Sequence, residues 1–192
     1  AIKRVRKFLK LKKSERKFCI TCQIILLPCE WEKHLNHNLI ENVCKSRFAR
    51  PTKLLSSKTI NNEEAQFLFD ETTVLFIIST LSKLGFTRII NLGCPSIHEM
   101  IQVNKQKYAM ESLLLDIDSR YCQFYTRRKF ILFNMFNGHF FEEDGQARFE
   151  NFIQQSEASK MCLLIDPPFG GLVQAIAKTI ETFNEKCSSI FN

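Results

Sequence analysis

Residues 166–171 read Asp-Pro-Pro-Phe-Gly-Gly and directly follow a short apolar run. Consecutive prolines remove backbone donors and fix a stiff turn, so the Asp166 carboxylate and the Pro167 carbonyl can both accept hydrogen bonds from the same amino group. Such acceptors would favour a more pyramidal nitrogen with its lone pair free to attack a methyl group. Phe169 can stack on the base, which contributes about 1 to 3 kcal/mol per base. A structural turn before a helix is the alternative. The segment predicts methyl transfer to an amino nitrogen by Asp166, Pro167, Pro168 and Phe169.

A second group of residues has the spacing of a metal site. Its members are Cys19, Cys22, His34 and His37. Thiolates and imidazoles in this combination suit tetrahedral zinc, and so short a segment would need the metal to hold its shape. Because the histidines are closer together than is usual, Cys29 and Cys44 are alternative ligands. A chance grouping of surface histidines and buried cysteines is the other interpretation.

The catalytic segment needs a scaffold, and four apolar runs separated by helical patterns indicate one: residues 88–92, 112–116, 130–134 and 161–165. Such runs are typical of a parallel α/β sheet covered on both faces. Ligands bind beyond the carboxyl ends of these strands. The residues there are Gly93, Asp116, Asn134 and Asp166. A small-residue loop, an acid for ribose hydroxyls, a polar group for adenine and a catalytic loop form the layout of a class I methyltransferase with a Rossmann-like sheet.

The strand-end residues also have simpler interpretations. The Gly93 loop has a single glycine and could be an ordinary turn into a helix with Ser96 as N-cap. Asp116 could cap the following helix, although Asp118 is better placed for that role. Gly85 is a good C-cap for the helix before the first strand. The expected helices cover residues 71–84, 96–104, 117–125 after a turn, a region around 142–159, and 172–183.

Positive charge is concentrated at the start of the chain, whose net charge is +7. Residues 1–17 contain nine Lys or Arg and one acid, Glu15. Such an arm attracts phosphate backbones without reading sequence, while a solvated tail or a localisation signal is the alternative. We expect a basic arm (1–17), a C2H2-type zinc finger (18–45), a connector (46–62) and a methyltransferase domain (63–192).

The composition indicates an intracellular protein. No apolar run approaches the ~18 to 20 residues that a membrane span needs, and the basic start lacks the apolar region of a signal peptide. Most of the eight cysteines stand singly in apolar stretches, which suits free thiols in a reducing compartment. Because the sequence begins with Ala and stops soon after a helical pattern, we expect a fragment of a longer protein.

Several segments together carry a more specific pattern. They are Lys17-Phe18-Cys19-x-Thr21-Cys22-Gln23, Gln66-x-Leu68-Phe69, Leu113-Leu114-Leu115-Asp116-Ile117-Asp118-x-Arg120-Tyr121, Asn134-Met135-Phe136-Asn137, and Asp166 through Leu172. From about Arg16 onward, the chain resembles the zinc finger CCHC domain-containing protein four family of ribosomal RNA N6-adenosine methyltransferases. Members of that family also carry an N-terminal GRF-type finger and C-terminal Cys/His-rich fingers, which this sequence does not contain.

The resemblance implies a C2H2 finger with the four ligands named above, on a Rossmann-like methyltransferase domain whose C-terminal strands lie outside this sequence. It implies zinc, S-adenosylmethionine as cofactor and catalysis by Asp166 to Phe169. The implied cofactor contacts are Leu68, Phe69, Asp70, Glu71, Gly93, Pro95, His98, Asp116, Asn134, Met135 and Asp166. The implied substrate is large-subunit ribosomal RNA, with residence in the nucleus, nucleolus and cytoplasm.

Other functions fit the same residues. Similar Asp/Asn-Pro-Pro-aromatic loops act on DNA or on protein amides, although the basic arm and the finger favour a nucleic acid. A noncatalytic zinc-dependent RNA-binding module on a degenerate methyltransferase fold is a further alternative. Intact Asp116 and Asp166 argue against it.

Overall fold

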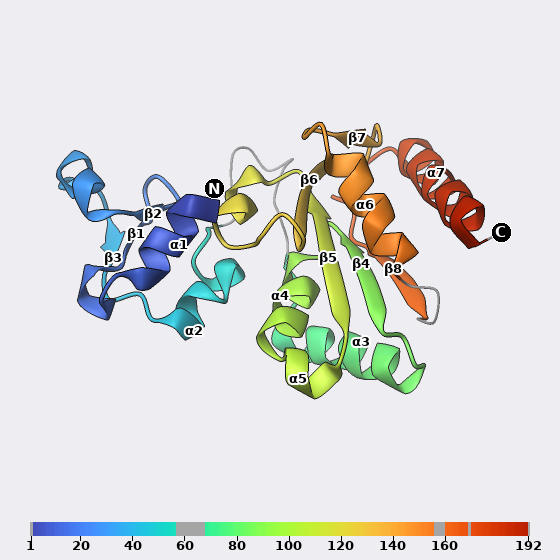
Figure 1. Cartoon of the computed structure of the whole chain (residues 1–192), viewed down its shortest axis with the longest axis horizontal. Coiled ribbons are helices and arrows are strands. Elements are labelled where there is room, and N and C mark those ends of the chain that lie inside the picture. Colours follow the sequence, from blue (N-terminus) through green and yellow to red (C-terminus); the bar gives the residue numbers. More distant parts are fainter. Residues whose placement is uncertain (1, 57–67, 156–159, 169, 192) are drawn as a thin grey trace. The chain divides into compact units, whose positions relative to one another are not determined.

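The computed structural model describes residues 2–56, 68–155, 160–168 and 170–191, and Figure 1 shows its elements along the chain. The chain divides into two compact units: unit 1 comprises Ala1–Ser57 with Arg120–Thr126, and unit 2 comprises Lys58–Ser119 with Arg127–Asn192. The expected boundaries between arm, finger, connector and methyltransferase domain stay predictions. Residues 57–62 of the predicted connector, Gln66 and Phe169 lie outside the described residues.

Unit 1 is built on a small antiparallel sheet. Strands β1 (Lys17–Cys19), β2 (Ile24–Leu26) and β3 (Leu39–Ile40) pair in the order β2-β1-β3. The short helices of this unit are α1 (Ile2–Lys10), η1 (Lys13–Glu15), η2 (Pro28–His34), α2 (Lys45–Phe48) and η3 (Pro51–Lys53), where η denotes a 3-10 helix.

Part of the basic arm is built into the core of unit 1. Val5, Phe8 and Leu9 share one face of α1, as helical spacing requires, and pack in a cluster with Phe18 and other apolar residues. The guanidinium of buried Arg16 donates hydrogen bonds to two carbonyls at the end of this helix, that of Leu9 in its last turn (3.0 Å) and that of Leu11 just after it (2.7 Å). Arg16 therefore stabilises the unit, and its charge is not available at the surface.

Unit 2 contains a mixed sheet in the order β7-β6-β5-β4-β8. Strands β4 (Arg88–Leu92), β5 (Glu111–Asp116), β6 (Phe130–Asn134) and β8 (Met161–Ile165) pair in parallel, whereas β7 (His139–Phe140) runs antiparallel to β6. The expected strands are confirmed, and β5 begins a residue earlier. In the central register Leu92 pairs with Leu115 and Ile165, so the carboxyl ends of three strands lie level.

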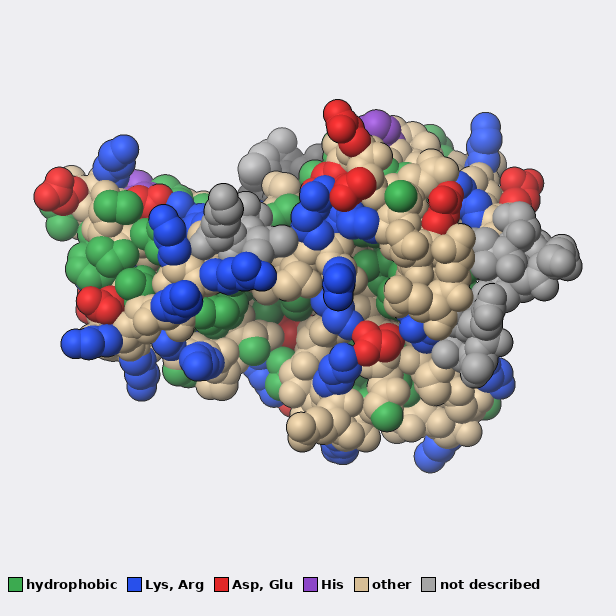
Figure 2. Space-filling model, in the orientation of Figure 1, with side chains coloured by type: hydrophobic (Ala, Val, Ile, Leu, Met, Phe, Trp, Pro, Cys, Tyr) green, Lys and Arg blue, Asp and Glu red, His purple; other side chains and the backbone are tan. Residues whose placement is uncertain are grey.

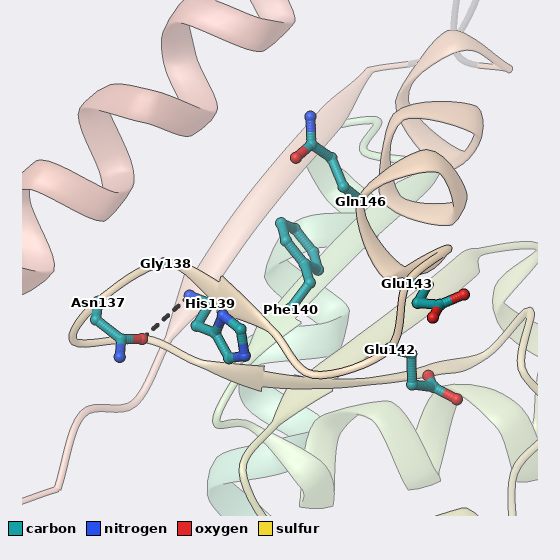
Figure 3. Close-up of a pocket in the computed structure, with 7 residues that line it drawn as sticks. All are labelled: Asn137, Gly138, His139, Phe140, Glu142, Glu143 and Gln146. Atoms are coloured by element: carbon teal, nitrogen blue, oxygen red, sulfur yellow. Dashed lines mark hydrogen bonds between the residues drawn. The ribbon is translucent and has the colours of Figure 1, made fainter.

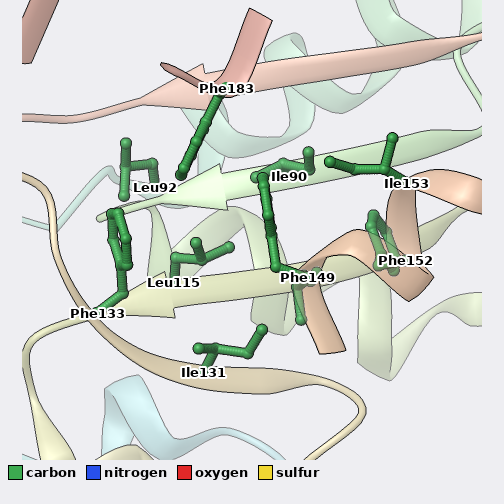
Figure 4. Packing of buried hydrophobic residues seen from close by; sticks show 10 residues of the cluster. Ile90, Leu92, Leu115, Ile131, Phe133, Phe149, Phe152, Ile153 and Phe183 are labelled. Atoms are coloured by element: carbon green, nitrogen blue, oxygen red, sulfur yellow. The ribbon is translucent and has the colours of Figure 1, made fainter. Parts of the chain in front are cut away.

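Helices cover both faces of this sheet. Along β4, Ile90 and Leu92 enter a cluster with residues of α6 (Gly145–Gln154) and α7 (Val173–Phe191), which Figure 4 shows from close by. Ile89 enters a second cluster with residues of α3 (Glu71–Lys83) and α4 (Pro95–Val103). Since successive residues of a strand point to opposite faces, this alternation confirms the α/β architecture. None of the described helices is long and apolar enough to cross a membrane.

Several local expectations are confirmed and others are wrong. Gly85 ends α3 with φ +76°, and the next amide, of Phe86, donates to the carbonyl of Leu81 at 3.0 Å. Ser96 is not the N-cap of α4, because Pro95 takes the first helical position, which proline favours, and Cys94 precedes it. The helix ends at Val103 and is followed by the short α5 (Lys105–Tyr108). After β5 there is only a 3-10 helix, η4 (Ser119–Gln123).

Candidate active site and metal centre

The loops after β4, β6 and β8 meet at the carboxyl edge of the sheet. The amide of Gly93 donates to the carbonyl of Leu115 at 2.9 Å, and the amide of Asp166 donates to that of Leu92 at 3.0 Å. A Cβ atom added to Gly93 would lie 2.7 Å from the Asp166 carbonyl oxygen and 2.8 Å from Cε of Met135. The structure therefore brings Gly93, Met135 and Asp166 together, and Gly93 has no room for a side chain.

Replacement of Gly93 by alanine should destabilise the protein more than an equivalent change elsewhere. Gly93 has φ +71° and Gly85 has φ +76°, so alanine is strained at both, but an added Cβ at Gly85 meets nothing within 4 Å. The clash at Gly93 is with backbone, so we expect Gly93→Ala to cost about 1 to 3 kcal/mol more than Gly85→Ala. Urea unfolding of the two variants measures the difference. Equal losses would contradict the packing described here.

Asp116 lies at the tip of β5 with 5% of its surface exposed. Its Oδ1 accepts a hydrogen bond from the amide of Asp118 at 2.8 Å, which closes a tight turn directly after the strand. Ile117, between them, is 58% exposed. The carboxylate is thus held in place at the strand end, as a ribose-binding acid would need to be, whereas the expected cap by Asp118 stays a prediction.

Asn134 holds the turn between β6 and β7. Its Oδ1 accepts from the amide of Phe136 at 2.9 Å, and its backbone carbonyl accepts from Gly138 at 3.0 Å. The ring of Phe136 reaches the predicted catalytic segment, because a Cβ added to Gly171 would lie 2.8 Å from its Cε1. The sequence did not predict this contact of Phe136.

The predicted catalytic segment, residues 166–171, forms an exposed turn. Pro167 and Pro168 are exposed and Asp166 is half-buried. The amide of Gly171 donates to the carbonyl of Pro168 at 3.1 Å, and Gly170 adopts φ +83°. Burial raises the pKa of the Asp166 carboxyl above its usual range. Phe169, the expected stacking residue, lies outside the described residues.

His98 is buried behind the Gly93 loop, with 0% of its surface exposed. Its Nδ1 lies 2.7 Å from the Ser112 hydroxyl, which also accepts from the Asn91 amide at 2.8 Å. Burial lowers the pKa of His98 to about 3, so the imidazole is neutral. The side chain thus links α4 to β5. Pro95 is also buried, and cofactor contacts by these residues stay predictions.

The segment before α3 is described from Leu68 onward. Phe69 packs against the cluster beneath α3 and α4, and Glu71 is the exposed first residue of α3. Asp70 is the N-cap: its Oδ1 accepts from the amides of Thr72 (2.8 Å) and Thr73 (3.1 Å). The Thr73 hydroxyl, which donates to Oδ2, is the largest cause of the lowered pKa of Asp70. The expected cofactor role of these residues stays a prediction.

The four expected metal ligands meet in unit 1, with one donor atom from each lying within 4.8 Å of the others. The Nδ1 atom of His37 lies 3.2 Å from Sγ of Cys22, 3.5 Å from Sγ of Cys19 and 3.0 Å from Nδ1 of His34. Around a tetrahedral zinc ion, with bonds of about 2.0 to 2.3 Å, donor atoms are about 3.3 to 3.8 Å apart. The distances from His37 are close to this range, so the four residues could together hold such an ion.

Local structure explains how these ligands converge. Cys19 ends β1, and Cys22 follows in a turn completed by Gln23 at φ +57°. His34 ends η2, and the His37 amide donates to its carbonyl at 3.0 Å. The alternative ligands lie elsewhere: Cys29 is exposed, and Sγ of Cys44 caps α2 by accepting from the Arg47 amide.

A hollow of roughly 430 Å³ lies beside the β6–β7 turn and is shown in Figure 3. Phe140 of β7, Glu143 just before α6 and Gln146 in its first turn are among the residues that line it. The turn is held by the amide of His139, which donates to Oδ1 of Asn137 at 3.1 Å. None of the predicted site residues lines this hollow, so it is distinct from the carboxyl-edge site.

Comparison with known proteins shows which family this chain is similar to. A family model described as probable N6-adenine methyltransferase matches residues 60–190. The rRNA N(6)-adenosine-methyltransferase ZCCHC4 of Bos taurus is 42% identical over 186 residues, covering 94% of this chain and 36% of the relative. Its Homo sapiens counterpart is 40% identical over 186 residues, with the same coverage, and that of Xenopus laevis is 38% identical over 182 residues, 93% of this chain and 37% of the relative. The chain spans little more than a third of these relatives, and it belongs to the N6-adenine methyltransferase family.

Proposed function

We propose that the chain provides the cofactor-binding and target-amine-binding parts of an S-adenosylmethionine-dependent N6-adenosine methyltransferase that acts on large-subunit ribosomal RNA. The observation that carries the proposal is the convergence of Gly93, Met135 and Asp166 at one sheet edge. It puts the loop expected beside the methyl donor directly against the loop expected to hold the acceptor amine. The substrate is proposed from the names of the relatives, which are rRNA N(6)-adenosine-methyltransferases.

The carboxyl edge of the sheet fits S-adenosylmethionine. Asp116 can accept hydrogen bonds from ribose hydroxyls, and its carboxylate is fixed by the Asp118 amide. Gly93 has no side chain, so Met135 and the Asp166 carbonyl can pack directly against the loop proposed to lie beside the cofactor. Met135 offers an apolar surface to the adenine. The bound cofactor supplies an electrophilic methyl group.

The Asp166–Pro168 turn orients the target amine. Asp166 and the Pro167 carbonyl accept hydrogen bonds from the amine hydrogens, which favours a nitrogen with its lone pair free. An amine that has gained a methyl group must lose a proton, and the Asp166 carboxylate would be the acceptor in place to receive it. The gain comes from positioning and from electrostatics in a partly buried site. The adenine must be unpaired or flipped to reach this turn.

The surface of unit 1 supports RNA as the partner. Arg4 pairs with Glu30 and Lys17 pairs with Glu41. Apart from buried Arg16, five further basic residues of the arm are exposed and form no ion pair within the described residues: Arg6, Lys7, Lys10, Lys12 and Lys13. Figure 2 shows Lys and Arg side chains gathered over the face that carries α1 and α2. Unpaired positive charge of this kind attracts phosphate, and ribosomal RNA as substrate would place the protein in the nucleolus and cytoplasm.

We also propose zinc as the ion of the Cys19, Cys22, His34 and His37 cluster. Thiolate and imidazole donors select zinc over the hard cations, which prefer oxygen ligands. Every one of the four positions is filled by a protein ligand, which is the pattern of a structural site. The zinc ion would hold the small sheet of unit 1 in shape.

Nucleoside analysis tests the proposed activity. Mass spectrometry of ribosomal RNA from cells with and without the full-length protein should show loss of N6-methyladenosine from the large-subunit RNA. Purified protein should restore the methyl group in vitro, and DNA and protein-amide substrates should not compete. Unchanged methylation together with tight RNA binding would instead support the noncatalytic RNA-binding module.

The dependence of kcat/KM on pH, on its acid side, should follow the ionisation of Asp166. Because burial raises the pKa of this carboxyl, it remains protonated at a pH where an ordinary aspartate, with a pKa of 3.8, is already ionised. A protonated Asp166 cannot receive the proton of the amine. We therefore expect kcat/KM to rise with pH through a midpoint above 3.8, since this ratio follows groups of the free enzyme. Circular dichroism at each pH separates this titration from acid unfolding, and a midpoint at or below the ordinary value contradicts the expectation.

A further inference from the structure

The connection between β5 and β6 leaves unit 2 and joins unit 1. The chain passes from one unit to the other between Ser119 and Arg120 and returns between Thr126 and Arg127. The preceding strand, β5, ends at Asp116, the residue proposed to hold the cofactor ribose. The segment that follows the cofactor acid is therefore a structural part of the unit that contains the metal cluster.

Hydrogen bonds and ring packing tie this segment into unit 1. The side-chain Oε1 of Gln123 accepts from the Ile25 amide at 2.9 Å, and its Nε2 donates to the Gln23 carbonyl at 2.9 Å. The ring of Phe124 packs between those of Phe18 (6.3 Å between centroids) and Phe48 (5.2 Å). Gln123 thus satisfies backbone groups at β2 as a neighbouring strand would, and Phe124 packs against the core of unit 1.

The same backbone is shaped by the metal ligands. Gln23 directly follows Cys22 and adopts φ +57°, and β2 begins at the next residue. The turn that carries Cys19 and Cys22 therefore also presents the Gln23 carbonyl to which Gln123 donates. Without an ion bound to the two thiolates, this turn is no longer held in one conformation. The backbone groups that hydrogen-bond to Gln123 are then no longer held in the geometry that those bonds need.

The chain between Asp116 and the segment in unit 1 is also short. Asp116 and Asp118 form their tight turn through the 2.8 Å hydrogen bond, and Ser119 alone separates Asp118 from the start of the segment in unit 1. The segment that Gln123 anchors in unit 1 therefore follows this turn directly along the chain. A ligand that binds to Asp116 binds more tightly when this residue is already ordered in the free protein, because binding then costs less conformational entropy.

We propose that metal binding in unit 1 and cofactor binding at Asp116 are thermodynamically coupled through residues 117–126, with Gln123 as the positioning residue. The inference rests on the proposed function for the role of Asp116. Coupling of this kind is reciprocal, so the cofactor raises the affinity for the metal by the same factor as the metal raises the affinity for the cofactor. The finger would then influence cofactor affinity through the chain connection, in addition to any contact with RNA.

Calorimetry and hydrogen exchange on the full zinc-loaded chain test this coupling. We expect Gln123→Ala, and the wild type stripped of zinc, to bind S-adenosylmethionine roughly five- to thirty-fold more weakly, the factor that corresponds to ordering about one backbone residue. The Asp118 amide should exchange faster in both, without cofactor present. Gln106→Ala is the matched control, because Gln106 is exposed on α5 in unit 2 and should leave both values unchanged.

Because the coupling is reciprocal, the effect of the cofactor on zinc affinity can also be measured, and a simple loss of structure would not produce that effect. Saturating S-adenosylmethionine should raise the zinc affinity of the wild type by the factor measured above and should raise it less in Gln123→Ala. If Gln123→Ala loses its zinc, Gln123→Glu replaces it, since it keeps an acceptor for the Ile25 amide and loses only the donor to Gln23. Unchanged cofactor affinity and Asp118 exchange in the stripped protein would overturn the coupling. A wild type that binds no cofactor refutes the proposed function, and the Asp118 exchange rates still decide the inference.

Discussion

Replacing Asp166 by alanine is expected to lower kcat by about 100- to 1000-fold, the usual effect of removing one group aimed at the reacting atoms. The variant keeps the Pro167 carbonyl but loses both the side-chain acceptor for the amine and the group that receives its proton. Its fold should persist, because the hydrogen bond from residue 166 to the Leu92 carbonyl is made by the backbone amide. Single-turnover transfer of a labelled methyl group to RNA measures the effect.

Stability separates catalytic loss from unfolding in this variant. Burial raises the pKa of Asp166, so its charged form is favoured in the unfolded chain, and ionisation above its ordinary pKa works against folding. Removing the carboxyl should therefore leave the thermal unfolding temperature unchanged or slightly higher at neutral pH. Glu181→Ala, a change at an exposed acid on α7, is the matched control. Full activity of Asp166→Ala would sink the proposed mechanism.

The scaffold of the carboxyl-edge site could be predicted because its strands are buried and parallel. A strand covered on both faces reads as a short continuous apolar run, and β4, β6 and β8 have the expected bounds. The strand tips then follow from topology, which is why Gly93 and Asp166 were expected at one edge. Strand β7 is two residues long and has no comparable signal.

Contacts that depend on precise side-chain reach could not be predicted. Nothing in the run Asn134 to Asn137 indicates that the ring of Phe136 reaches Gly171, although the paired glycines at 170–171 were a signal that something approaches closely. The membership of Gln123 in unit 1 is harder still. Its partners Ile25 and Gln23 lie 98 and 100 positions away, and a glutamine in a turn carries no signal of long-range pairing.

The metal centre was predictable for the opposite reason. The chemistry of Cys and His at short spacing identifies the ligands without knowledge of the fold. The close His34 and His37 pair is accommodated because the His37 amide donates to the His34 carbonyl in a turn and both rings present Nδ1. Spacing alone could not show this choice of ring nitrogen.

Removal of the metal is expected to unfold unit 1 while leaving the sheet of unit 2 intact. The strands β1, β2 and β3 are only three, three and two residues long, too short to hold together through their own hydrogen bonds. Binding of structural zinc contributes about 10 to 16 kcal/mol in comparable small modules, more than a core of this size supplies. A chelator, or Cys19→Ser, should therefore abolish hydrogen-exchange protection in β1 and β2 and spare β4 and β5.

The exposed thiol of Cys29 provides the control for this prediction, since it lies outside the ligand group and Cys29→Ser removes a cysteine of the same unit without touching the cluster. Elemental analysis should find one zinc per chain in the wild type and in Cys29→Ser and much less in Cys19→Ser. Re-addition of zinc after chelation should restore protection, because ligand binding supplies the folding free energy of such modules. Protection of β1 and β2 that survives chelation would mean that the apolar cluster around Phe8, Phe18 and Phe124 suffices to fold the unit, and the metal would then be a ligand of a preformed site.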